Sequence, residues 1–506
     1  MDFDVAIKKE FLVQTQEQQP QSVKQSGSND WHGTKRIDYY KICQKTLRQE
    51  DCTNPKCSAV HDIKEYLSTR PPLLEIPCVF YTQYGHCPYT YNCMYTHPNQ
   101  TSPDNFINPA FEQKIEINSQ YHRDLQSTIF KQIRQKEFND PTPQELFVMP
   151  KKSLILAPMC TVGTIPFRRL CIHYGADITL SEMVIARSVV KGDLTELKKL
   201  RKHKEEKIFG IQLTGDAQET AQVALMIKNL KLADYVDLNA ACPQDVATNI
   251  NCGFAIANRP GKMGGVLRAL DETGVNYSVK TRIGDFKGDS IVDRIFEKEL
   301  IGLKNLRAIA LHGRTAKQRY TKLADWDVLS EVNERIKTLR AENEINYEFI
   351  GNGDIYNVKE ALQALECCDS VIIGRGALQK PWIFKEIKEG RELDLSSQER
   401  FEMLQMFCEF CVEYYGSDRM GIEKSREQFL ENWNFMSRYV PLGICDEIQK
   451  LNERIPEHIG RDDLETLMGS QKASDWVKLS EMLFGPVPEG FMFQPKHKSK
   501  GFVENK

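Results

Sequence analysis

The sequence lacks long apolar runs, and this absence argues against a membrane-spanning protein. None of its 506 residues lies in a stretch that approaches the ~18 consecutive apolar residues of a membrane-spanning helix. The first residues, MDFDVAIKKEFLVQTQEQQPQ, also lack the apolar core of a secretory signal peptide. We therefore expect a protein of the cytoplasm, the nucleus or both, with no membrane partner. In that setting, fifteen cysteines predict metal ligands, a catalytic thiol and core thiols rather than disulfides.

The sequence also lacks an excess of positive charge. Its formal net charge is −3, so any nucleic acid must bind to local basic patches. The strongest candidate patch is ELKKLRKHKEEK at residues 196–207, which supplies Lys198, Lys199, Arg201, Lys202 and Lys204. Weaker candidates are Lys424, Arg426, Lys496, Lys498 and Lys500. A basic run of this kind is equally typical of a solvated helix face, so both interpretations remain open.

Composition divides the chain into six segments. Residues 1–37 are rich in Gln and Ser and predict a disordered arm. The other predicted segments are a cysteine-rich region at 38–100, a polar linker with some helix at 101–152, an α/β domain at 153–390, a helical domain at 391–486 and a basic tail at 487–506.

Two cysteine–histidine sets of nearly identical spacing lie in the cysteine-rich region. The first is Cys43, Cys52, Cys57 and His61, and the second is Cys78, Cys87, Cys93 and His97. Three thiolates and one imidazole complete a tetrahedral zinc shell with no open position, so we expect two structural zinc ions. Segments this short cannot bury a core without a metal.

The spacing of both sets is that of CCCH zinc fingers, which typically bind single-stranded RNA. Aromatic residues between the second set of ligands suit base stacking. They are Phe80, Tyr81, Tyr84, Tyr89, Tyr91 and Tyr95. For two or three of the six, packing within the small fold is the expected role instead.

Eight short apolar runs alternate with helical patterns in the α/β domain, and they predict a closed (β/α)₈ barrel. The runs are LILAPM (154–159), ITLSEM (178–183), IFGIQL (208–213), YVDLNAAC (235–242), NYSVKTR (276–282), AIALHGR (308–314), YEFIGNGD (347–354) and SVIIGRG (370–376). The pattern after residue 395 is helical only. It opens with a capping box from Ser396 to Glu399, and it places Cys408 and Cys411 on an apolar helix face, where we interpret them as core residues.

Polar residues follow the predicted strands at the end where this fold places its active site. They include Glu182, Gln212, Asn239, Lys280, Arg282, His312 and Arg314. The last two loops, GNGD (351–354) and GRG (374–376), supply backbone N–H groups and Arg375 where such barrels bind phosphate. We therefore expect flavin mononucleotide (FMN), with Lys280 stabilising the anionic reduced ring.

Several of these stretches resemble the tRNA-dihydrouridine synthases. They are LAPMCTVGTIPFRR, DLNAACP, VKTRIG, LHGRTAKQRYTKLADW, GNGDI and IGRGALQKPWIF. With paired CCCH fingers ahead of the barrel, the chain is most similar to the eukaryotic zinc-finger branch of that family. The resemblance implies reduction of the C5=C6 bond of a uridine in tRNA by FMN, with NADPH as the reductant. It further implies position 47 in the variable loop, and we expect a monomer that binds tRNA and could bind other RNA.

The resemblance also assigns roles to residues. Cys242 matches the cysteine of an Asn-x-x-Cys-Pro motif and is the implied proton donor to C5. A free thiol with a pKa of ~8.5 is mostly protonated at neutral pH, so it can donate. The implied flavin contacts are Pro158, Met159, Gln212, Lys280, His312, Asn352, Gly353, Asp354, Gly374 and Arg375, and Asn239 and Arg314 are implied substrate contacts. The chain departs from the family at Ala241 and at Thr248–Cys252, where two positive charges and two glycines are replaced. We interpret Cys252 as a replacement for glycine and not as a second acid.

Two other functions remain open at this point. An FMN barrel that reduces free pyrimidines would share the chemistry, but it would need neither zinc fingers nor a helical domain. A non-catalytic RNA-binding protein with a degenerate barrel would have no reason to keep Cys242, Lys280, His312 and Arg375 together. A yellow colour on purification and the detection of dihydrouridine in RNA separate the three functions.

Overall fold

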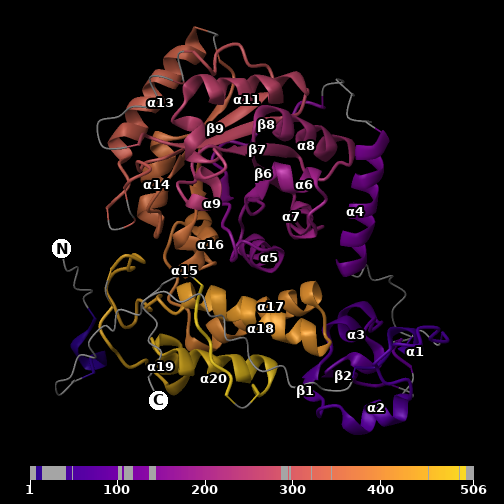
Figure 1. Cartoon of the computed structure of the whole chain (residues 1–506). Coiled ribbons are helices and arrows are strands. Elements are labelled where there is room, and N and C mark those ends of the chain that lie inside the picture. The colour runs from indigo at the N-terminus through magenta and orange to yellow at the C-terminus, as the bar shows by residue number, and fades with distance from the viewer. Residues whose placement is uncertain are drawn as a thin grey trace. The chain divides into compact units, whose positions relative to one another are not determined.

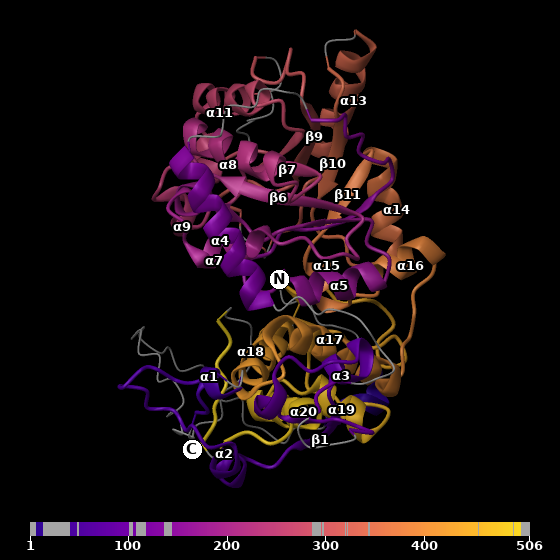
Figure 2. The same ribbon diagram turned by 90° about the vertical axis from the view of Figure 1, so that its right-hand side faces the viewer.

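The structure, a computed structural model, describes residues 7–13, 41–47, 50–100, 105–107, 118–135, 144–285, 295, 298–318, 320, 322–342, 345–453, 455–488 and 490–496. These residues form two compact units (Figures 1 and 2). The first unit comprises the described parts of Ser119–Asp394 and Arg438–Ile455, and the second comprises those of Ile7–Asn118, Leu395–Ser437 and Pro456–Lys506. Among the described residues, no helix has both the length and the apolar character that crossing a membrane requires.

Eight parallel strands close into a barrel in the first unit, so the predicted fold class is confirmed. They are β3 (Leu154–Leu156), β4 (Ile178–Leu180), β6 (Ile208–Thr214), β7 (Tyr235–Asn239), β8 (Tyr277–Arg282), β9 (Leu306–His312), β10 (Glu348–Asn352) and β11 (Ser370–Ile373). Each corresponds to one predicted run. The strand order is β4-β3-β11-β10-β9-β8-β7-β6, and the pairing of β4 with β6 closes the ring. A short extra strand, β5 (Val184–Ile185), pairs with the end of β6.

Helices connect these strands on the outside of the barrel, as Figure 1 shows for α8, α11, α13 and α14. The helices of this unit are α4 (Asn118–Gln135), α5 (Ile165–His173), α6 (Ala186–Val190), α7 (Leu194–Leu197), η3 (Lys198–Leu200), α8 (Ala217–Asn229), α9 (Asp245–Thr248), α10 (Phe254–Ala257), α11 (Pro260–Glu272), α13 (Trp326–Ala341), α14 (Val358–Cys367), α15 (Arg375–Gln379) and α16 (Ile383–Glu389).

Side chains alternate along each strand between two apolar layers. In β7, Val236 and Leu238 pack in the large outer layer against the helices. Tyr235 belongs instead to the small inner layer, which also contains Ile178, Ala310 and Ile350. The inner layer fills the barrel from its N-terminal end, and the polar strand ends lie beyond it.

The last residues of the predicted linker close the N-terminal end of the barrel. Met149 is buried in the inner layer, and the ring of Phe147 stacks on Tyr235 with 5.3 Å between centroids. The Phe147 N–H donates to Asn276 Oδ1 at 3.3 Å, and Asn276 Nδ2 donates to the Glu145 carbonyl at 2.8 Å. Residues 144–153 therefore belong to the barrel and do not act as a spacer.

The second unit combines the cysteine-rich segment with the C-terminal helices. Its elements are η1 (Lys9–Phe11), α1 (Gln44–Leu47), α2 (Ile63–Thr69), β1 (Leu74–Pro77), α3 (Val79–Tyr84), η2 (Thr90–Asn92), β2 (Tyr95–Thr96), α17 (Ser397–Tyr415), α18 (Arg419–Met436), α19 (Asp463–Gly469) and α20 (Ala473–Phe484). The predicted capping box begins α17, with Ser396 as the N-cap and Glu399 bonding back to it. Cys408 and Cys411 are buried on α17, as expected of core residues.

The second cysteine–histidine segment packs against the turn between α17 and α18. Met94 N–H donates to the Ser417 carbonyl at 2.9 Å, and Cys93 forms an antiparallel bridge with Asp418. Gly416 has a φ of +114°, and a Cβ atom there would lie 2.5 Å from the hydroxyl oxygen of Tyr89. The turn therefore requires glycine both for its backbone conformation and for this close approach.

Part of the segment predicted to be a disordered arm has a defined structure. Residues 7–13 lie beside residues 457–459, with Leu12 bridged to His458 and the Ile459 N–H donating to the Phe11 carbonyl at 2.8 Å. The apolar residues Ile7, Phe11 and Leu12 indicate this structure in the sequence, because the rest of the segment is polar. The rest of the predicted arm, and residues 497–506 of the predicted tail, lie outside the described residues.

We expect Gly416→Ala to destabilise the second unit by at least about 2 kcal/mol, because it combines an unfavourable φ with a steric clash. Gly490→Ala is a matched control. Gly490 has a φ of +79°, but a Cβ atom there would meet nothing within 4 Å, so it should cost only about 1 kcal/mol. Chemical denaturation followed by circular dichroism measures both variants. Equal losses would show that the contact with Tyr89 contributes nothing.

Candidate active site and metal centres

Five polar side chains converge at the C-terminal end of the barrel. Gln212, Asn239, Lys280, His312 and Asn352 lie at the ends of β6 to β10 and continue the inward-facing positions of those strands. Strand register places Asn239 beside Lys280 and Asn352 beside His312. Each is less than a tenth exposed. The predicted ring of strand-end residues is therefore brought together in one place.

Lys280 is a buried cation with unused hydrogen-bond donors. Its side-chain ammonium donates to no group in the described part of the chain. Burial, and secondarily the charge of Arg282, lower its pKa to about 8, although Asp237 and Cys242 act in the opposite direction. A buried ammonium without a partner is costly. This arrangement therefore suits a ligand that brings a hydrogen-bond acceptor or a negative charge.

His312 lies beside Lys280 as a neutral ring. Burial, together with four neighbouring cations, lowers its pKa well below the usual range. Arg314 Nη1 lies 3.2 Å from His312 Nε2. Because a guanidinium only donates, Nε2 must accept, and the ring hydrogen must be on Nδ1. That Nδ1–H has no acceptor among the described residues, so it is available to a ligand.

Arg314, expected to contact the substrate, is instead completely buried. Besides His312, its guanidinium donates to the Lys322 carbonyl and to Asp354. Arg314 therefore fixes the tautomer of His312 and joins two loops, and it presents no surface at the barrel mouth.

Asp354 connects the two loops predicted to bind phosphate. Its carboxylate accepts from Arg314, from Arg375 and from the Ala324 N–H. Arg375 also lies over the ring of Tyr320, 4.2 Å from its centroid. Asp354 therefore holds Arg375 in place and is not itself a group that would face a phosphate.

Two glycines keep these loops close to their neighbours. Gly353 has a φ of +136°, and a Cβ atom there would lie 2.5 Å from Ala324 Cβ. A Cβ atom on Gly374 would lie 3.3 Å from Ala157 Cβ. Glycine at these two positions therefore lets the loops pack closely against Ala324 and Ala157.

Pro158 and Met159 follow β3 at the same end of the barrel and are half-buried. They lead into a tight turn in which Gly163 N–H donates to the Met159 carbonyl at 2.9 Å. Thr161 N–H donates to Glu182 Oε1 at 2.7 Å, so the predicted strand-end Glu182 serves to fix this turn.

The loop after β7 presents Cys242 at the barrel mouth. The Cys242 N–H donates to Asn239 Oδ1 at 3.0 Å, and its carbonyl accepts from the Phe254 N–H at 2.8 Å. Gly253 has a φ of +59°, and a Cβ atom there would lie 2.6 Å from the Cys242 carbonyl oxygen. Cys252, by contrast, is buried in the outer apolar layer. Only Cys242 of these two thiols is therefore placed to meet a substrate.

Two functional candidates, Asp237 and Arg282, were missed or left without a role by sequence reasoning. Asp237 lies inside the barrel and accepts from Gln212 Nε2 at 2.7 Å and Ser278 Oγ at 2.6 Å, and its burial raises its pKa. Arg282 donates to the Ala241 carbonyl at 2.8 Å and to the Thr315 carbonyl at 3.1 Å. The sequence does contain a signal for Asp237, because it is an acidic residue within an apolar strand, two positions before Asn239.

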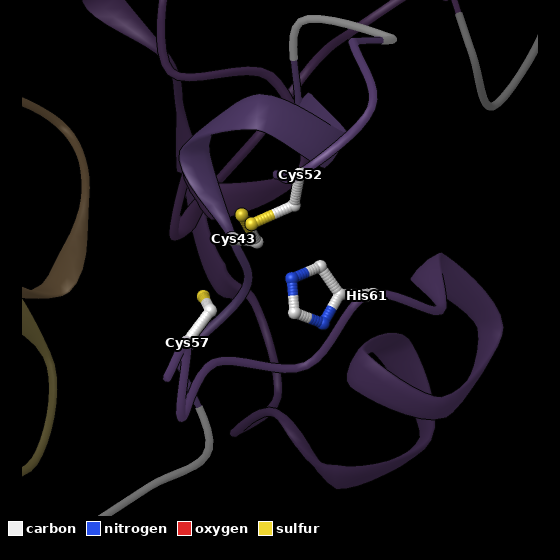
Figure 3. Close-up of side chains that lie close together, drawn as sticks. All are labelled: Cys43, Cys52, Cys57 and His61. Atoms are coloured by element: carbon white, nitrogen blue, oxygen red, sulfur yellow. The ribbon is translucent and has the colours of Figure 1, made fainter. Parts of the chain in front are cut away.

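The first cysteine–histidine set forms a tight but accessible cluster (Figure 3). One ligand atom from each of Cys43, Cys52, Cys57 and His61 lies within 4.8 Å of the others. Figure 3 shows the His61 ring turned toward the sulfur atoms of Cys43 and Cys52. Cys43 is buried, whereas His61 is exposed.

The second set is equally tight but buried. Cys78, Cys87 and Cys93 are at most 1% exposed, and the Cys87 sulfur lies 3.9 Å from the Ser417 hydroxyl. The thiols of Cys87 and Cys93 lower the pKa of Cys78 to about 4, which favours a thiolate. The buried His97 Nε2 has no hydrogen-bond partner in the described part of the protein. These donors fit a tetrahedral metal ion.

The aromatic residues of the second set are used within the unit. Phe80, Tyr81 and Tyr95 are buried. The Tyr84 hydroxyl donates to Glu413 at 3.1 Å, Tyr89 packs on Gly416, and the Tyr91 ring meets Phe106 edge-on at 5.0 Å. The three buried rings confirm the expectation that two or three of the six pack within the small fold, and the other three are also in contact with protein.

The predicted basic patch is partly structural as well. Lys199 pairs with Glu196 at 2.7 Å, Lys202 pairs with Asp234 at 2.6 Å, and Arg201 lies over the Tyr121 ring. Lys198 and Lys204 remain exposed.

Arg426 is a correction to the list of RNA candidates. It is buried and donates to Ser480 Oγ and to the carbonyls of Phe484 and Gly485, so it caps α20. Lys424 is exposed, and Lys496 pairs with Glu427 at 2.7 Å. Lys498 and Lys500 lie outside the described residues.

A family model described as "Dihydrouridine synthase (Dus)" matches residues 155–432. The chain is 32% identical to the "tRNA-dihydrouridine(47) synthase [NAD(P)(+)]-like" protein of Homo sapiens, over 92% of this chain and 82% of that protein. It is 33% identical to the "tRNA-dihydrouridine(47) synthase [NAD(P)(+)]" of Kluyveromyces lactis, over 96% of this chain and 88% of that protein.

We expect Cys87→Ser to destabilise the second unit more than Cys57→Ser, because Cys87 is buried against Ser417 whereas Cys57 is partly exposed. Each variant should lose one metal ion. Only Cys87→Ser should also lower the melting midpoint of the unit, by at least about 5 °C. Metal analysis and circular dichroism measure the two effects. A larger thermal loss in Cys57→Ser would contradict the difference between the two clusters.

Proposed function

The chain belongs to the dihydrouridine synthase family, and we propose that it is an oxidoreductase that reduces a uridine in tRNA to 5,6-dihydrouridine, using FMN and NADPH. The observation that carries the proposal is the buried ammonium of Lys280, which has no hydrogen-bond partner among the described residues and lies beside the neutral His312, at the mouth where Cys242 lies. The names of the relatives support tRNA as the partner and position 47 as the uridine. They leave both NADPH and NADH open, and the choice of NADPH is our proposal.

FMN would supply hydride chemistry when bound. The residues at the barrel mouth suit it, because they offer donors at one end and a cation with two close-packed glycines at the other. Gln212, Lys280 and His312 would meet the ring, and Pro158 and Met159 would lie against it. Asn352, Gly353, Gly374 and Arg375 would hold the phosphate end, with Asp354 as the residue that orients Arg375.

Each side chain at the ring has a definite task. Lys280 supplies positive charge that favours an electron-rich ligand, and burial makes that charge effective. His312, kept neutral, donates one hydrogen bond from Nδ1 without adding another charge. Cys242 donates the proton that saturates C5 of the uridine, and Asn239 holds the loop that carries it.

The two cysteine–histidine sets would hold two structural zinc ions, and the tRNA would be bound by exposed basic residues such as Lys198 and Lys204. We further propose that the protein acts as a monomer in the cytoplasm, the nucleus or both. Purified protein should contain FMN at about one and zinc at about two per chain. A colourless protein that does not bind added FMN would overturn the flavin proposal.

We expect Cys242→Ala to slow dihydrouridine formation by ~10² to 10⁴-fold, the usual contribution of general-acid catalysis. NADPH should still bleach the flavin absorbance, because that step needs no protein acid. Single-turnover assays with tRNA separate the two steps. Cys252→Ala is the matched control, because Cys252 is buried outside the mouth, and its activity should stay within about threefold. An inactive Cys252→Ala with an active Cys242→Ala would reverse the assignment.

We expect the rate of flavin reduction by NADPH, a step that does not use the Cys242 thiol, to fall as the pH rises through about 8 or above. Burial lowers the pKa of Lys280 to about 8. Its side-chain ammonium is therefore charged below that pH and becomes neutral above it. An electron-rich ligand beside the ammonium would raise the pKa of Lys280, so the fall in rate would occur at higher pH. Lys280→Met should be at least ~10²-fold slower at pH 7 and should no longer show this decline. A pH profile of both proteins tests this, and an unchanged decline in Lys280→Met would assign it to another group.

A further inference from the structure

A chain of hydrogen bonds runs beneath the barrel mouth from Asp237 to the Cys242 loop. Gln212 Nε2 donates to Asp237 Oδ2 at 2.7 Å, and Asn239 Nδ2 donates to Gln212 Oε1 at 2.7 Å. Asn239 Oδ1 then accepts from the backbone N–H groups of Ala241 at 3.1 Å and Cys242 at 3.0 Å. The three side chains are at most 7% exposed, so bulk water does not compete strongly for these bonds.

The two ends of this chain allow only one arrangement of the amides between them. At one end, a carboxylate accepts and cannot donate, so Gln212 must turn its NH₂ group toward Asp237. At the other end, backbone N–H groups only donate, so Asn239 must turn its oxygen toward residues 241–242. The remaining groups, Asn239 NH₂ and the Gln212 oxygen, then face each other as donor and acceptor. Every link therefore depends on the others for its orientation.

We propose that Asp237 is a positioning residue, which acts through Gln212 and Asn239 to hold the backbone of residues 241–242 and so place the Cys242 thiol. This inference rests on the proposed function only in giving Cys242 its role as proton donor. Proton transfer requires the donor within hydrogen-bond reach of its acceptor, and a displacement of about 1 Å can cost ~10²-fold in rate. On this view Asn239 supports the loop and is not a substrate contact.

Hydrogen exchange of the purified full-length protein tests the chain without relying on catalysis. In Asp237→Leu, Gln212 loses its acceptor, and we expect the amides of residues 241 and 242 to exchange about tenfold faster. In Asp237→Asn, the remaining side-chain oxygen still accepts from Gln212, and the new NH₂ group donates to Ser278 Oγ. Protection should therefore be kept in Asp237→Asn although the charge is gone.

Ser278→Ala is the matched control. It removes the other hydrogen bond to the same carboxylate, at 2.6 Å, but leaves the chain to Cys242 complete. Its amides 241 and 242 should exchange as in the wild type. Asn239→Ala breaks the last link and should accelerate exchange as much as Asp237→Leu, which keeps the test decisive if Asp237→Leu does not fold. Wild-type protection in Asn239→Ala, or lost protection in Ser278→Ala, would overturn the proposal.

Single-turnover reduction of tRNA by protein with prereduced flavin gives the functional measurement. Asp237→Leu should slow this step by about 10- to 100-fold with the apparent KM changed less than about threefold, and Asp237→Asn should restore the rate. An increased KM with an unchanged maximal rate would overturn the positioning role. If the wild type forms no dihydrouridine, the proposed function fails, whereas the exchange measurements still decide whether Asp237 holds the loop.

Discussion

The pairing of β4 with β6 closes eight parallel strands into a ring, and the candidate active site depends on this closure. Parallel strands in one ring have their C-terminal ends at the same edge, so residues far apart in the sequence, such as Gln212 and Asn352, both lie there. The alternation of side chains then decides which of them face inward. The apolar inner layer, with Phe147 and Met149 at its base, fills the opposite end of the barrel.

The parts of the molecule that depend on local pattern could be predicted from the sequence. Each barrel strand is a short apolar run, and the last inward residue of each strand from β6 to β10 is polar, so both the fold and the convergence of Lys280, His312 and Asn352 followed from spacing. The two cysteine–histidine clusters followed in the same way, because four such residues at these separations are typical of a metal site. The capping box at Ser396 is a local signal of the same kind.

The parts that depend on distant partners could not be predicted. An arginine at a strand end reads as a ligand contact, yet Arg314 is satisfied by His312, Asp354 and the Lys322 carbonyl. Arg426 was a weaker candidate for RNA contact because of its charge, but it caps a helix more than fifty residues later. Asp237 was overlooked because its role depends on the hydrogen bond that it accepts from Gln212, which lies on a neighbouring strand. In each case the residue type was visible and its partner was not.

The contact between Cys87 and Ser417 joins positions 330 residues apart, with the whole barrel encoded between them. At the usual 5–20 residues per second of synthesis, roughly 15 to 70 s separate their emergence from the ribosome. Throughout that interval the thiols of Cys78, Cys87 and Cys93 lack the turn that covers them in the finished protein. The nascent chain therefore carries these thiols through the synthesis of its largest domain before the turn that covers them has been made, so their protection during translation is part of the assembly of this protein.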